Sequence, residues 1–448
     1  MEMYYSYPKY KSSGDSWLGD IPEHWTARRS DFVIDTNRRQ VSADSLNGVD
    51  VIHYSIPNVQ EYGRGVVEGG DKVDSAKLLI IEEQLLVSKL NPRKSTLCIA
   101  KPDDAYRVVA SSEFVPILPG KANLRYAYYL WGSDKVTKLL SSMVQSVTRS
   151  HQRVNPADIL KLHWAWPTLD EQQTIARFLD FKTAQIDALI AKKISLLDKL
   201  AEKRMALISH AVTKGLDQSL PMKSSGVEWI GDIPRHWSIR RMKFAAKLES
   251  GHTPSKQVPE YWEDCDIPWV SLNDSKQLAA VDYISETAIQ INSLGLANSS
   301  ARLLPANAVV FTRDATIGLC AITTRPMAVS QHLIAWIPGL DITSLYLLRV
   351  FSAMKGFLDS FTFGATIKTI GMPDVKRLAM PIPPKNEQKA ITAFIDEQLR
   401  TISPQIQAIE TAIDKLTEYR SALITGAVTG KIDVRGFGTP QRPEGVAS

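Results

Sequence analysis

The sequence predicts an α+β protein in which two mixed α/β domains are separated by two long antiparallel helices that form a coiled coil. Three observations lead to this fold class. Two blocks of sequence each occur twice, one of them has apolar residues at seven-residue intervals, and the stretches between the blocks alternate short β-type runs with turn-forming residues. The repetition gives the predicted fold an internal pseudo-twofold symmetry.

The first repeated block begins and ends with tryptophan. Residues 17–25, WLGDIPEHW, return as residues 229–237, WIGDIPRHW, at an offset of 212 (229 − 17). The tetrapeptide KSSG precedes each copy at the same offset. Each copy stands immediately before one of the predicted domains, which indicates two structural units of the same design.

The second repeated block is helical. Residues 171–217 return as residues 387–433, at an offset of 216 (387 − 171). Heptad spacing of apolar residues is the pattern of a coiled-coil seam. In the later copy, one series of seam positions comprises Ile395, Ile402, Ile409, Leu416 and Leu423; in the earlier copy, the matching series comprises Leu179, Ile186, Lys193, Leu200 and Leu207.

The two helical blocks differ in one respect that affects their predicted length. The earlier block has no internal proline, so one helix is expected from about residue 171 to about residue 214. In the later block, Ser403 and Pro404 have the pattern of an N-cap followed by proline at the first helical position. A short helix over residues 386–400 is therefore predicted to precede a longer one over residues 403–427.

Each long helix has an apolar stripe that needs a partner, and its own repeat is the simplest one. Because a whole domain lies between the two helices in the chain, they can run antiparallel. The alternative is that each helix packs separately on its own domain.

The intervening stretches predict mixed α/β domains. Runs such as Leu78–Ile81, Leu85–Val87 and Ala308–Phe311 have β-type composition and are bounded by Gly, Pro, Asn and Asp. These stretches differ in sequence from each other although their flanks are alike, so the two domains are expected to perform different versions of one task. The predicted organisation is a repeat segment (1–25), a first domain (26–167), a central helical region (168–216), a repeat segment with linker (217–237), a second domain (238–384), a distal helical region (385–433) and a polar tail (434–448).

Composition restricts the class of protein. The net charge of +5 and the pI of about 8.8 permit an anionic partner. No apolar signal segment or membrane span occurs, so the expected location is the cytoplasm. The three cysteines, Cys98, Cys265 and Cys320, lack metal-ligand or redox spacing, and no nucleotide-binding, metal-binding or methyltransferase motif is found. The chain is therefore expected to bind without catalysing, with no catalytic residue, no metal site and no cofactor of its own.

The repeated residues resemble those of a known family. The run 226–237, the segment Pro381–Pro384 before Glu387 and Gln388, and the segments 178–187 and 202–216 are similar to the specificity (S) subunits of type I restriction-modification systems. The resemblance spans essentially the whole chain in the family's order. One departure is the segment Trp164–Thr168, which is less rich in proline than Pro381–Pro384.

The resemblance implies a function in DNA recognition. The two domains would be target recognition domains that each read half of a bipartite, asymmetric site in double-stranded DNA, with the helices as a ruler between them. It also implies two modification (M) subunits as partners, one for each repeat unit, and restriction (R) subunits that join the complex. S-adenosylmethionine, ATP and Mg would belong to those partners. The positions assigned to subunit binding are Glu171, Gln172, Phe178, Glu387, Gln388 and Phe394.

Candidate DNA contacts are polar or cationic residues in loops at corresponding places of the two domains. Such side chains can bind phosphates and base edges, although a solvated surface charge is the plain alternative for each one. The candidates are Lys89, Arg149, His151, Gln152 and Arg153 in the first domain, and Arg313, Thr366 and Lys368 in the second.

A different class of function also fits the repeats. The chain could be a non-catalytic coiled-coil scaffold that joins protein partners through its two domains. DNA binding that weakens with salt would distinguish the two hypotheses, because only a DNA-binding protein releases counterions.

Overall fold

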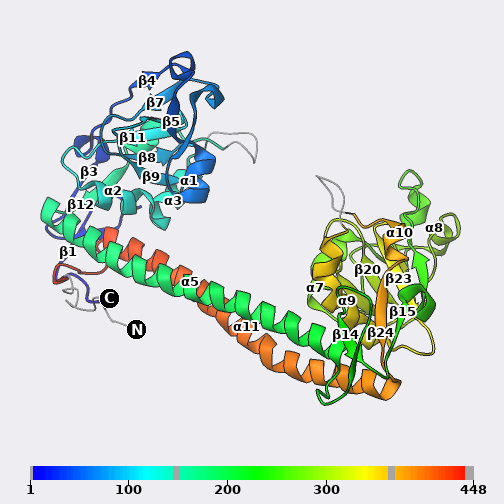
Figure 1. The fold of residues 1–448 in the computed structure, drawn as a ribbon. Helices are drawn as coiled ribbons and strands as arrows, with labels where there is room; N and C mark the ends of the chain where they lie inside the picture. The colour runs from blue at the N-terminus through cyan, green and yellow to red at the C-terminus, as the bar shows by residue number, and fades with distance from the viewer. Residues whose placement is uncertain (1–3, 145–151, 362–368, 439–448) are drawn as a thin grey trace. The chain divides into compact units, whose positions relative to one another are not determined.

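The structure is a computed structural model that describes residues 4–144, 152–361 and 369–438. The chain forms two compact units, one made of Met1–Lys193 with Thr411–Ser448 and the other of Ile194–Glu410. Each unit contains one mixed α/β domain and a segment of each of two long helices, α5 (Leu169–Lys214) and α11 (Lys385–Val428), as Figure 1 shows.

The domain of the first unit is built on a five-stranded sheet and a three-stranded sheet. The larger sheet has the order β4-β7-β10-β5-β6, with bounds Gln40–Val41, Lys77–Leu79, Arg107–Ala110, Asp50–Tyr54 and Val66–Gly69. The smaller has the order β11-β8-β9, with bounds Phe114–Ile117, Gln84–Ser88 and Leu97–Ala100. The helices of this domain are α1 (Ile56–Tyr62), α2 (Leu124–Trp131), α3 (Asp134–Ser142) and α4 (Pro156–Leu160).

The domain of the second unit also has one five-stranded and one three-stranded sheet, but with a different strand order. The larger sheet is β16-β23-β20-β21-β18, with bounds Ala246–Ser250, Leu333–Pro338, Val309–Thr312, Cys320–Thr323 and Tyr283–Ile284. The smaller is β19-β17-β22, with bounds Gln290–Ile291, Ile267–Val270 and Ala328–Val329. The helices are α6 (Met242–Ala245), α7 (Ser275–Ala280), α8 (Ser293–Ala297), α9 (Ser344–Asp359) and α10 (Met372–Val375).

The repeated tryptophan block forms the same small structure twice. Strands β1 (Tyr10–Ser12) and β2 (Asp20–Pro22) pair antiparallel in the first unit, and β13 (Met222–Ser224) and β14 (Asp232–Pro234) pair in the same register in the second. A second antiparallel pair follows in each unit and joins the two ends of the domain. These pairs are β3 with β12 (Thr26–Arg29, His163–Trp166) and β15 with β24 (Ser238–Arg241, Ala379–Ile382).

The two long helices are antiparallel, as predicted. In the first unit the beginning of α5 packs on the end of α11, and Arg420 donates hydrogen bonds to both carboxylate oxygens of Asp187 (2.8 and 3.1 Å). In the second unit the end of α5 packs on the beginning of α11, with Leu207 and Leu399 in one apolar cluster. Seam positions that are buried include Leu179, Ile186, Leu200, Ile395, Ile402 and Leu423.

The predicted break before Pro404 is wrong. Helix α11 is one continuous helix of 44 residues with Pro404 inside it. Proline removes one hydrogen bond of the helix, to the carbonyl four residues earlier, at Arg400. Both Pro404 and Arg400 are exposed, so water can bind the carbonyl while the buried seam on the other face holds the helix together. Helix α5 agrees with the prediction of one uninterrupted helix.

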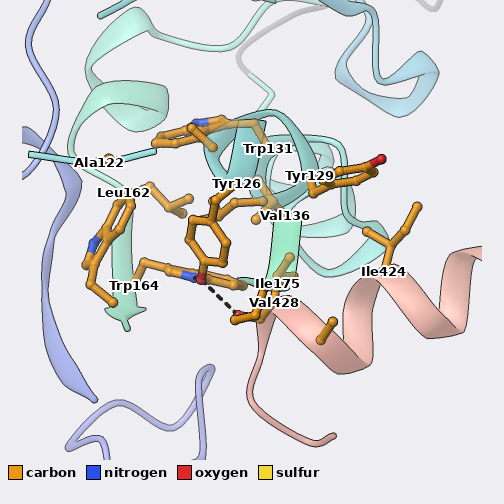
Figure 2. Close-up of a cluster of buried hydrophobic side chains, with 14 of the residues drawn as sticks. Ala122, Tyr126, Tyr129, Trp131, Val136, Leu162, Trp164, Ile175, Ile424 and Val428 are labelled. Carbon is orange, nitrogen blue, oxygen red and sulfur yellow. Dashed lines mark hydrogen bonds between the residues drawn. The ribbon is translucent and has the colours of Figure 1, made fainter. Parts of the chain in front are cut away.

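Each domain also binds the end of a long helix through a buried tyrosine. In the first unit the Tyr126 hydroxyl donates to the carbonyl of Val428 near the end of α11 (3.3 Å), and Figure 2 shows this ring among Trp131, Trp164 and Ile175. A helix leaves its last carbonyls without partners inside the helix, so the hydroxyl satisfies one of them. Tyr346 of the second domain binds the carbonyl of Val212 near the end of α5 in the same way (3.1 Å).

A carboxylate on each long helix provides a second attachment. The Tyr129 hydroxyl donates to Asp180 of α5 (2.6 Å), and burial raises the pKa of Tyr129 to about 12, so the phenol stays a donor. In the second unit Arg349 is buried and donates to Asp396 of α11 (2.6 Å) and to Asp282 of its own domain (2.9 Å). Repeat-related positions therefore hold each domain on its helix with different chemistry.

The end of each long helix packs tightly against the repeated tryptophan. A Cβ atom at Gly430, just after α11, would lie 2.5 Å from Cδ of Pro22 and 3.2 Å from the ring of Trp25. A Cβ atom at Gly215, just after α5, would lie 3.1 Å from the ring of Trp237. Both glycines have positive φ angles, 71° and 74°, which other residues rarely adopt.

Gly430→Ala is expected to lower the midpoint of thermal unfolding more than Gly14→Ala does. Both positions have positive φ angles, so each substitution costs about 1 kcal/mol of backbone strain. The new Cβ at Gly430 would also collide with Pro22, whereas nothing lies within 4 Å of the position at Gly14. Scanning calorimetry of the two variants measures the difference. Equal midpoints would contradict the close packing of this helix end.

Candidate nucleic-acid interface and helix junctions

Lys89 stands at the base of a loop in the first domain, just after β8. Its backbone N–H donates to the carbonyl of Glu113 (3.0 Å), and its own carbonyl accepts from the N–H of Val154 (2.9 Å). The Glu113 carboxylate lies 4.0 Å from Lys89 Nζ and accepts two hydrogen bonds from Arg153, at 3.1 and 3.2 Å. Two of the predicted cations are thus brought together around one carboxylate that the prediction had missed.

The loop that follows Lys89 has an unusual backbone. Asn91 and Ser95 have φ angles of 48° and 46°, in the left-handed region, and the backbone N–H of Asn91 donates to the carbonyl of Gln152 (2.7 Å). Between them, Arg93 and Lys94 are exposed. This short run adds two cations beside the predicted contacts, and the sequence Asn-Pro-Arg-Lys was the signal that could have identified them.

Arg313 occupies the corresponding place in the second domain, just after β20. Its backbone N–H donates to the carbonyl of His332 (3.0 Å), and its carbonyl accepts from the N–H of Ile370 (3.0 Å). The ring of His332 is 2.8 Å from a carboxylate oxygen of Asp314. The guanidinium of Arg313 is half-buried. Its Nε makes no hydrogen bond to the described residues and lies 3.6 Å from a carboxylate oxygen of Asp314, with which it forms an ion pair.

The two loop bases share a backbone frame and differ in the side chains attached to it. In each domain a cationic residue follows a buried strand, and both its backbone N–H and its backbone carbonyl form hydrogen bonds with corresponding segments. The neighbour that receives its N–H is Glu113 in one domain and His332 in the other. A carboxylate accepts hydrogen bonds, whereas an imidazole can donate them. The two surfaces are therefore suited to different hydrogen-bonding patterns.

Four predicted contacts fall outside the residues that the structure describes: Arg149, His151, Thr366 and Lys368. The residues at the edge of these segments pair in the same manner in both domains, Leu90 with Arg153 and Asp314 with Thr369. These two bridges join residues that the sequence alignment of the two domains places at equivalent positions. Gln152 is half-exposed beside its segment, and the roles of all five residues stay predictions.

The first long helix begins at a buried carboxylate. Glu171 accepts hydrogen bonds from the hydroxyl of Tyr7 (2.7 Å) and the indole N–H of Trp25 (3.2 Å), and it contacts the ring of His24 (2.8 Å). Burial and the bond to Glu171 raise the pKa of Tyr7 far above its ordinary value. Glu171 therefore joins the tryptophan hairpin and the N-terminal segment to the start of α5.

The second long helix begins in the same way but is less covered. Glu387 accepts from the indole N–H of Trp237 (2.9 Å) and contacts the ring of His236 (2.8 Å). The Glu387 side chain is 32% exposed, compared with 5% for Glu171. The difference leaves one face of this carboxylate open to solvent.

The glutamine next to each of these carboxylates binds the domain. Gln172 accepts from the backbone N–H of Asn123 (2.8 Å), and Gln388 accepts from that of Thr343 (2.9 Å). In each case the side-chain amide also donates to the carbonyl of the proline five residues earlier. Both glutamines are buried, so their contacts in this structure are within the chain.

The last repeat pair assigned to subunit binding differs sharply between the two units. Phe178 is 2% exposed and lies between the rings of Tyr4 and Phe437, at 5.4 and 5.3 Å. Its counterpart Phe394 is 40% exposed. Of the six positions predicted to contact a partner, the structure gives Glu171, Gln172, Phe178 and Gln388 a buried place inside the chain. Their role toward another subunit stays a prediction.

Two further properties concern the described residues only. None of the helices is both long enough and apolar enough to span a membrane, within residues 4–144, 152–361 and 369–438. In the same part of the chain, no group of three or more His, Cys, Asp or Glu side chains is arranged to hold a metal ion.

Sequence comparison finds similarity to specificity proteins of type I restriction-modification systems. The family model of the type I restriction modification DNA specificity domain matches residues 234–411. The MjaIX specificity subunit of a type I restriction enzyme from Methanocaldococcus jannaschii is 28% identical over 186 residues, covering 40% of this chain and 43% of that relative. The HindI specificity subunit from Haemophilus influenzae is 22% identical over 477 residues, covering 93% of this chain and 98% of the relative.

Structural comparison gives the same fold. A solved chain from a study of complex assembly and conformational transition of the type I R-M system aligns with a TM-score of 0.70 at 16% identity. The alignment covers 92% of this chain and 99% of the solved one. The fold is therefore shared over 92% of this chain.

Tyr7→Phe is expected to lower the free energy of unfolding by about 1.5 to 3 kcal/mol, because the buried Glu171 carboxylate loses a hydroxyl donor. Tyr5→Phe is the matched control, since the Tyr5 side chain is 82% exposed. Urea denaturation followed by tryptophan fluorescence measures both. The assigned role of the Tyr7 hydroxyl is wrong if the two variants are equally stable.

Proposed function

Because this chain belongs to the family of specificity subunits of type I restriction-modification systems, we propose that it reads a bipartite, asymmetric site in double-stranded DNA, one half with each domain. The observation that carries the proposal is the shared loop base: Lys89 and Arg313 have the same backbone bonds in the two domains but different neighbours. Two domains that read different half-sites need the same backbone arrangement at the loop but different side chains to contact the bases.

The chemistry of each loop base supports a particular kind of contact. In the first domain, Lys89, Arg93, Lys94 and Arg153 provide positive charge for phosphates, and the Glu113 carboxylate held among them can accept from the amino group of cytosine. In the second domain, the guanidinium of Arg313, which lies beside the Asp314 carboxylate, can donate to guanine or to a phosphate oxygen. The two half-sites are therefore expected to differ in sequence.

The catalytic work is assigned to partner subunits. We expect two modification subunits, one for each repeat unit, and restriction subunits that complete the complex. In this proposal those partners use S-adenosylmethionine, ATP and Mg, whereas this chain contributes no catalytic group and acts in the cytoplasm. Phe394 and Glu387 are the partly exposed members of the set assigned to subunit contacts.

The long helices are proposed to set the spacing between the half-sites. A helix rises about 1.5 Å per residue, so the 46 residues of α5 correspond to about 69 Å of helix. Successive half-sites on one face of B-DNA are about 34 Å apart for each helical turn. The helix is thus long enough to span such a separation.

A scaffold that joins only proteins is the alternative, and salt distinguishes the two. Binding of the full chain to duplex DNA is expected to fall steeply between 50 and 200 mM salt, roughly in proportion to the number of phosphate contacts. Salt-independent binding, or none, would favour the scaffold.

Arg313→Ala is expected to weaken binding by about 1 to 3 kcal/mol, the usual size of a base contact, and to do so for one half-site only. Arg302→Ala is the matched control, because Arg302 belongs to the same domain, is largely exposed and pairs with Glu249. Binding is measured by fluorescence anisotropy with duplexes that differ in one half-site at a time.

The pattern of loss decides the role of Arg313. A uniform loss on all sequences indicates a phosphate contact and removes Arg313 from base reading. Wild-type binding by the variant would remove it from the interface altogether.

Deletion of one heptad from each helix, residues 197–203 and residues 404–410, is expected to shorten the recognised spacer without altering either half-site. Seven residues correspond to about 10 Å of helix, or about three base pairs. Selection from a duplex library with random spacers measures the change. A spacer of unchanged length in a folded variant would contradict the role of the helices as a ruler.

A further inference from the structure

A connected set of polar side chains lies at the loop base of the second domain. It consists of Thr253, Gln331, His332 and Asp314, each in contact with the next. Gln331 and His332 lie in the connection between β22 and β23, and the carbonyl of His332 accepts the backbone N–H of Arg313 (3.0 Å). We call these four side chains the Gln331–His332 network. The network is therefore continuous with the arginine proposed to contact DNA.

The backbone places one end of this network by a close approach. A Cβ atom at Gly251, just after β16, would lie 2.1 Å from the backbone carbonyl oxygen of Ser330, so the approach requires glycine. It brings the segment that contains Thr253 beside the connection that contains Gln331. The Thr253 hydroxyl donates to the side-chain carbonyl of Gln331.

Asp314 determines which nitrogen of His332 carries the proton. One Asp314 carboxylate oxygen lies 2.8 Å from Nδ1 of His332, and the other lies 3.6 Å from Nε of Arg313. A carboxylate only accepts hydrogen bonds, so Nδ1 donates and, in the neutral ring, Nε2 is an acceptor. The Asp314 side chain is 10% exposed, whereas that of His332 is 42% exposed. The carboxylate therefore orients an imidazole that is partly open to solvent.

Gln331 provides a donor next to this acceptor. Because its Oε1 accepts from Thr253, the amide nitrogen Nε2 is directed toward His332. The two Nε2 atoms of Gln331 and His332 are 3.5 Å apart, at the limit of a hydrogen bond. Each atom can exchange this weak contact for a shorter one to a ligand. A donor and an acceptor are thus held side by side, and Gln331 is exposed.

A donor beside an acceptor matches one base in the major groove. Adenine presents the accepting N7 next to its N6 amino donor, whereas guanine presents two acceptors, N7 and O6. Cytosine presents an amino donor, and thymine presents an acceptor and a methyl group. Guanine would place O6 against the accepting Nε2 of His332, so that neither atom receives a hydrogen. The pair Gln331 and His332 is therefore selective for adenine.

We propose that the Gln331–His332 network reads an adenine in the half-site of the second domain; this rests on the proposed function in DNA recognition. Gln331 donates to N7, and His332 accepts from the N6 amino group. Asp314 is a positioning residue, because it acts through the proton on His332. The equivalent positions of the first domain hold Ser112 and Glu113, which lack the amide and the imidazole, so this reading is expected in one half-site only.

The test selects preferred sites of the full chain from a library of random duplexes and repeats the selection with variants. Gln331→Ala and His332→Ala should relax the preference at the same single position, an adenine. Each should lower affinity for the original site about tenfold, measured by fluorescence anisotropy. Gln277→Ala is the matched control, because Gln277 is an exposed glutamine of α7 in the same domain and outside the network. It should select the wild-type site.

Asp314→Asn separates a positioning role from a structural one. The guanidinium of Arg313 carries only donors, so it attracts the oxygen of the new amide and leaves the amide nitrogen facing His332. Nδ1 then accepts, Nε2 carries the proton, and two donors face the base. The preferred base at the adenine position should change to guanine. A general loss of stability would not produce that change.

Base analogues at the selected adenine assign each contact to one side chain. Purine lacks the N6 amino group and should bind the wild type about tenfold more weakly than adenine does. His332→Ala should not distinguish purine from adenine. Replacement of adenine by 7-deazaadenine removes N7 and should weaken the wild type similarly, with no effect on Gln331→Ala.

The outcomes separate this inference from the proposed function. One adenine whose preference depends on both Gln331 and His332 supports the inference. If the wild type selects a defined site and both alanine variants select the same site, the inference is overturned and the DNA function stands. A uniform loss at all positions also overturns it, and an adenine preference kept in Asp314→Asn removes the positioning role. If the wild type selects no sequence, the DNA function itself fails.

Discussion

The architecture depends on a carboxylate at the start of each long helix that accepts the indole N–H of the hairpin tryptophan. Glu171 holds Trp25, and Glu387 holds Trp237. Each tryptophan also packs against the glycine that follows the other long helix: Trp25 against Gly430 after α11, and Trp237 against Gly215 after α5. One side chain therefore connects a hairpin, the start of one helix and the end of the other. A carboxylate shielded from water is stable only with donors of this kind. Both junctions keep these donors, and both lie in the repeated part of the sequence.

The domains combine a fixed frame with variable surfaces. Their attachments to the helices use the same positions, Tyr126 and Tyr346 for a helix carbonyl, although Tyr129 and Arg349 bind their carboxylates with different chemistry. The backbone bonds around the loop bases are likewise equal. Side chains beyond that frame can change with little effect on the attachment, because Lys89 and Arg313 take no part in these bonds to the helices. This division is compatible with the proposal that the two domains read different sequences.

Both junctions contain the same bond between a glutamate and a tryptophan, but different segments pack around it. At the first, the segments before β1 and after α11 add aromatic rings and a hydroxyl to the Glu171 site. At the second, a direct connection between α5 and β13 leaves the same face of the helix open. The two junctions therefore differ in the chain segments that pack against them, two separate segments at the first and the single connection 215–221 at the second.

Local patterns in the sequence determined the repeats, the two long antiparallel helices and strands such as β8 and β20, because heptad spacing and β-type runs depend on near neighbours. Pro404 is the exception: a local signal for a break was overruled by the buried seam on the other face of α11. Only the tertiary structure placed Glu113 beside Lys89 and His332 beside Arg313, since these pairs are formed by strands and loops distant in sequence. It also revealed that Glu171 and Gln172 are buried within the chain, while Phe394 is open. Sequence periodicity reports which face of an element is apolar, but the identity of the group that covers that face is decided by packing between distant segments.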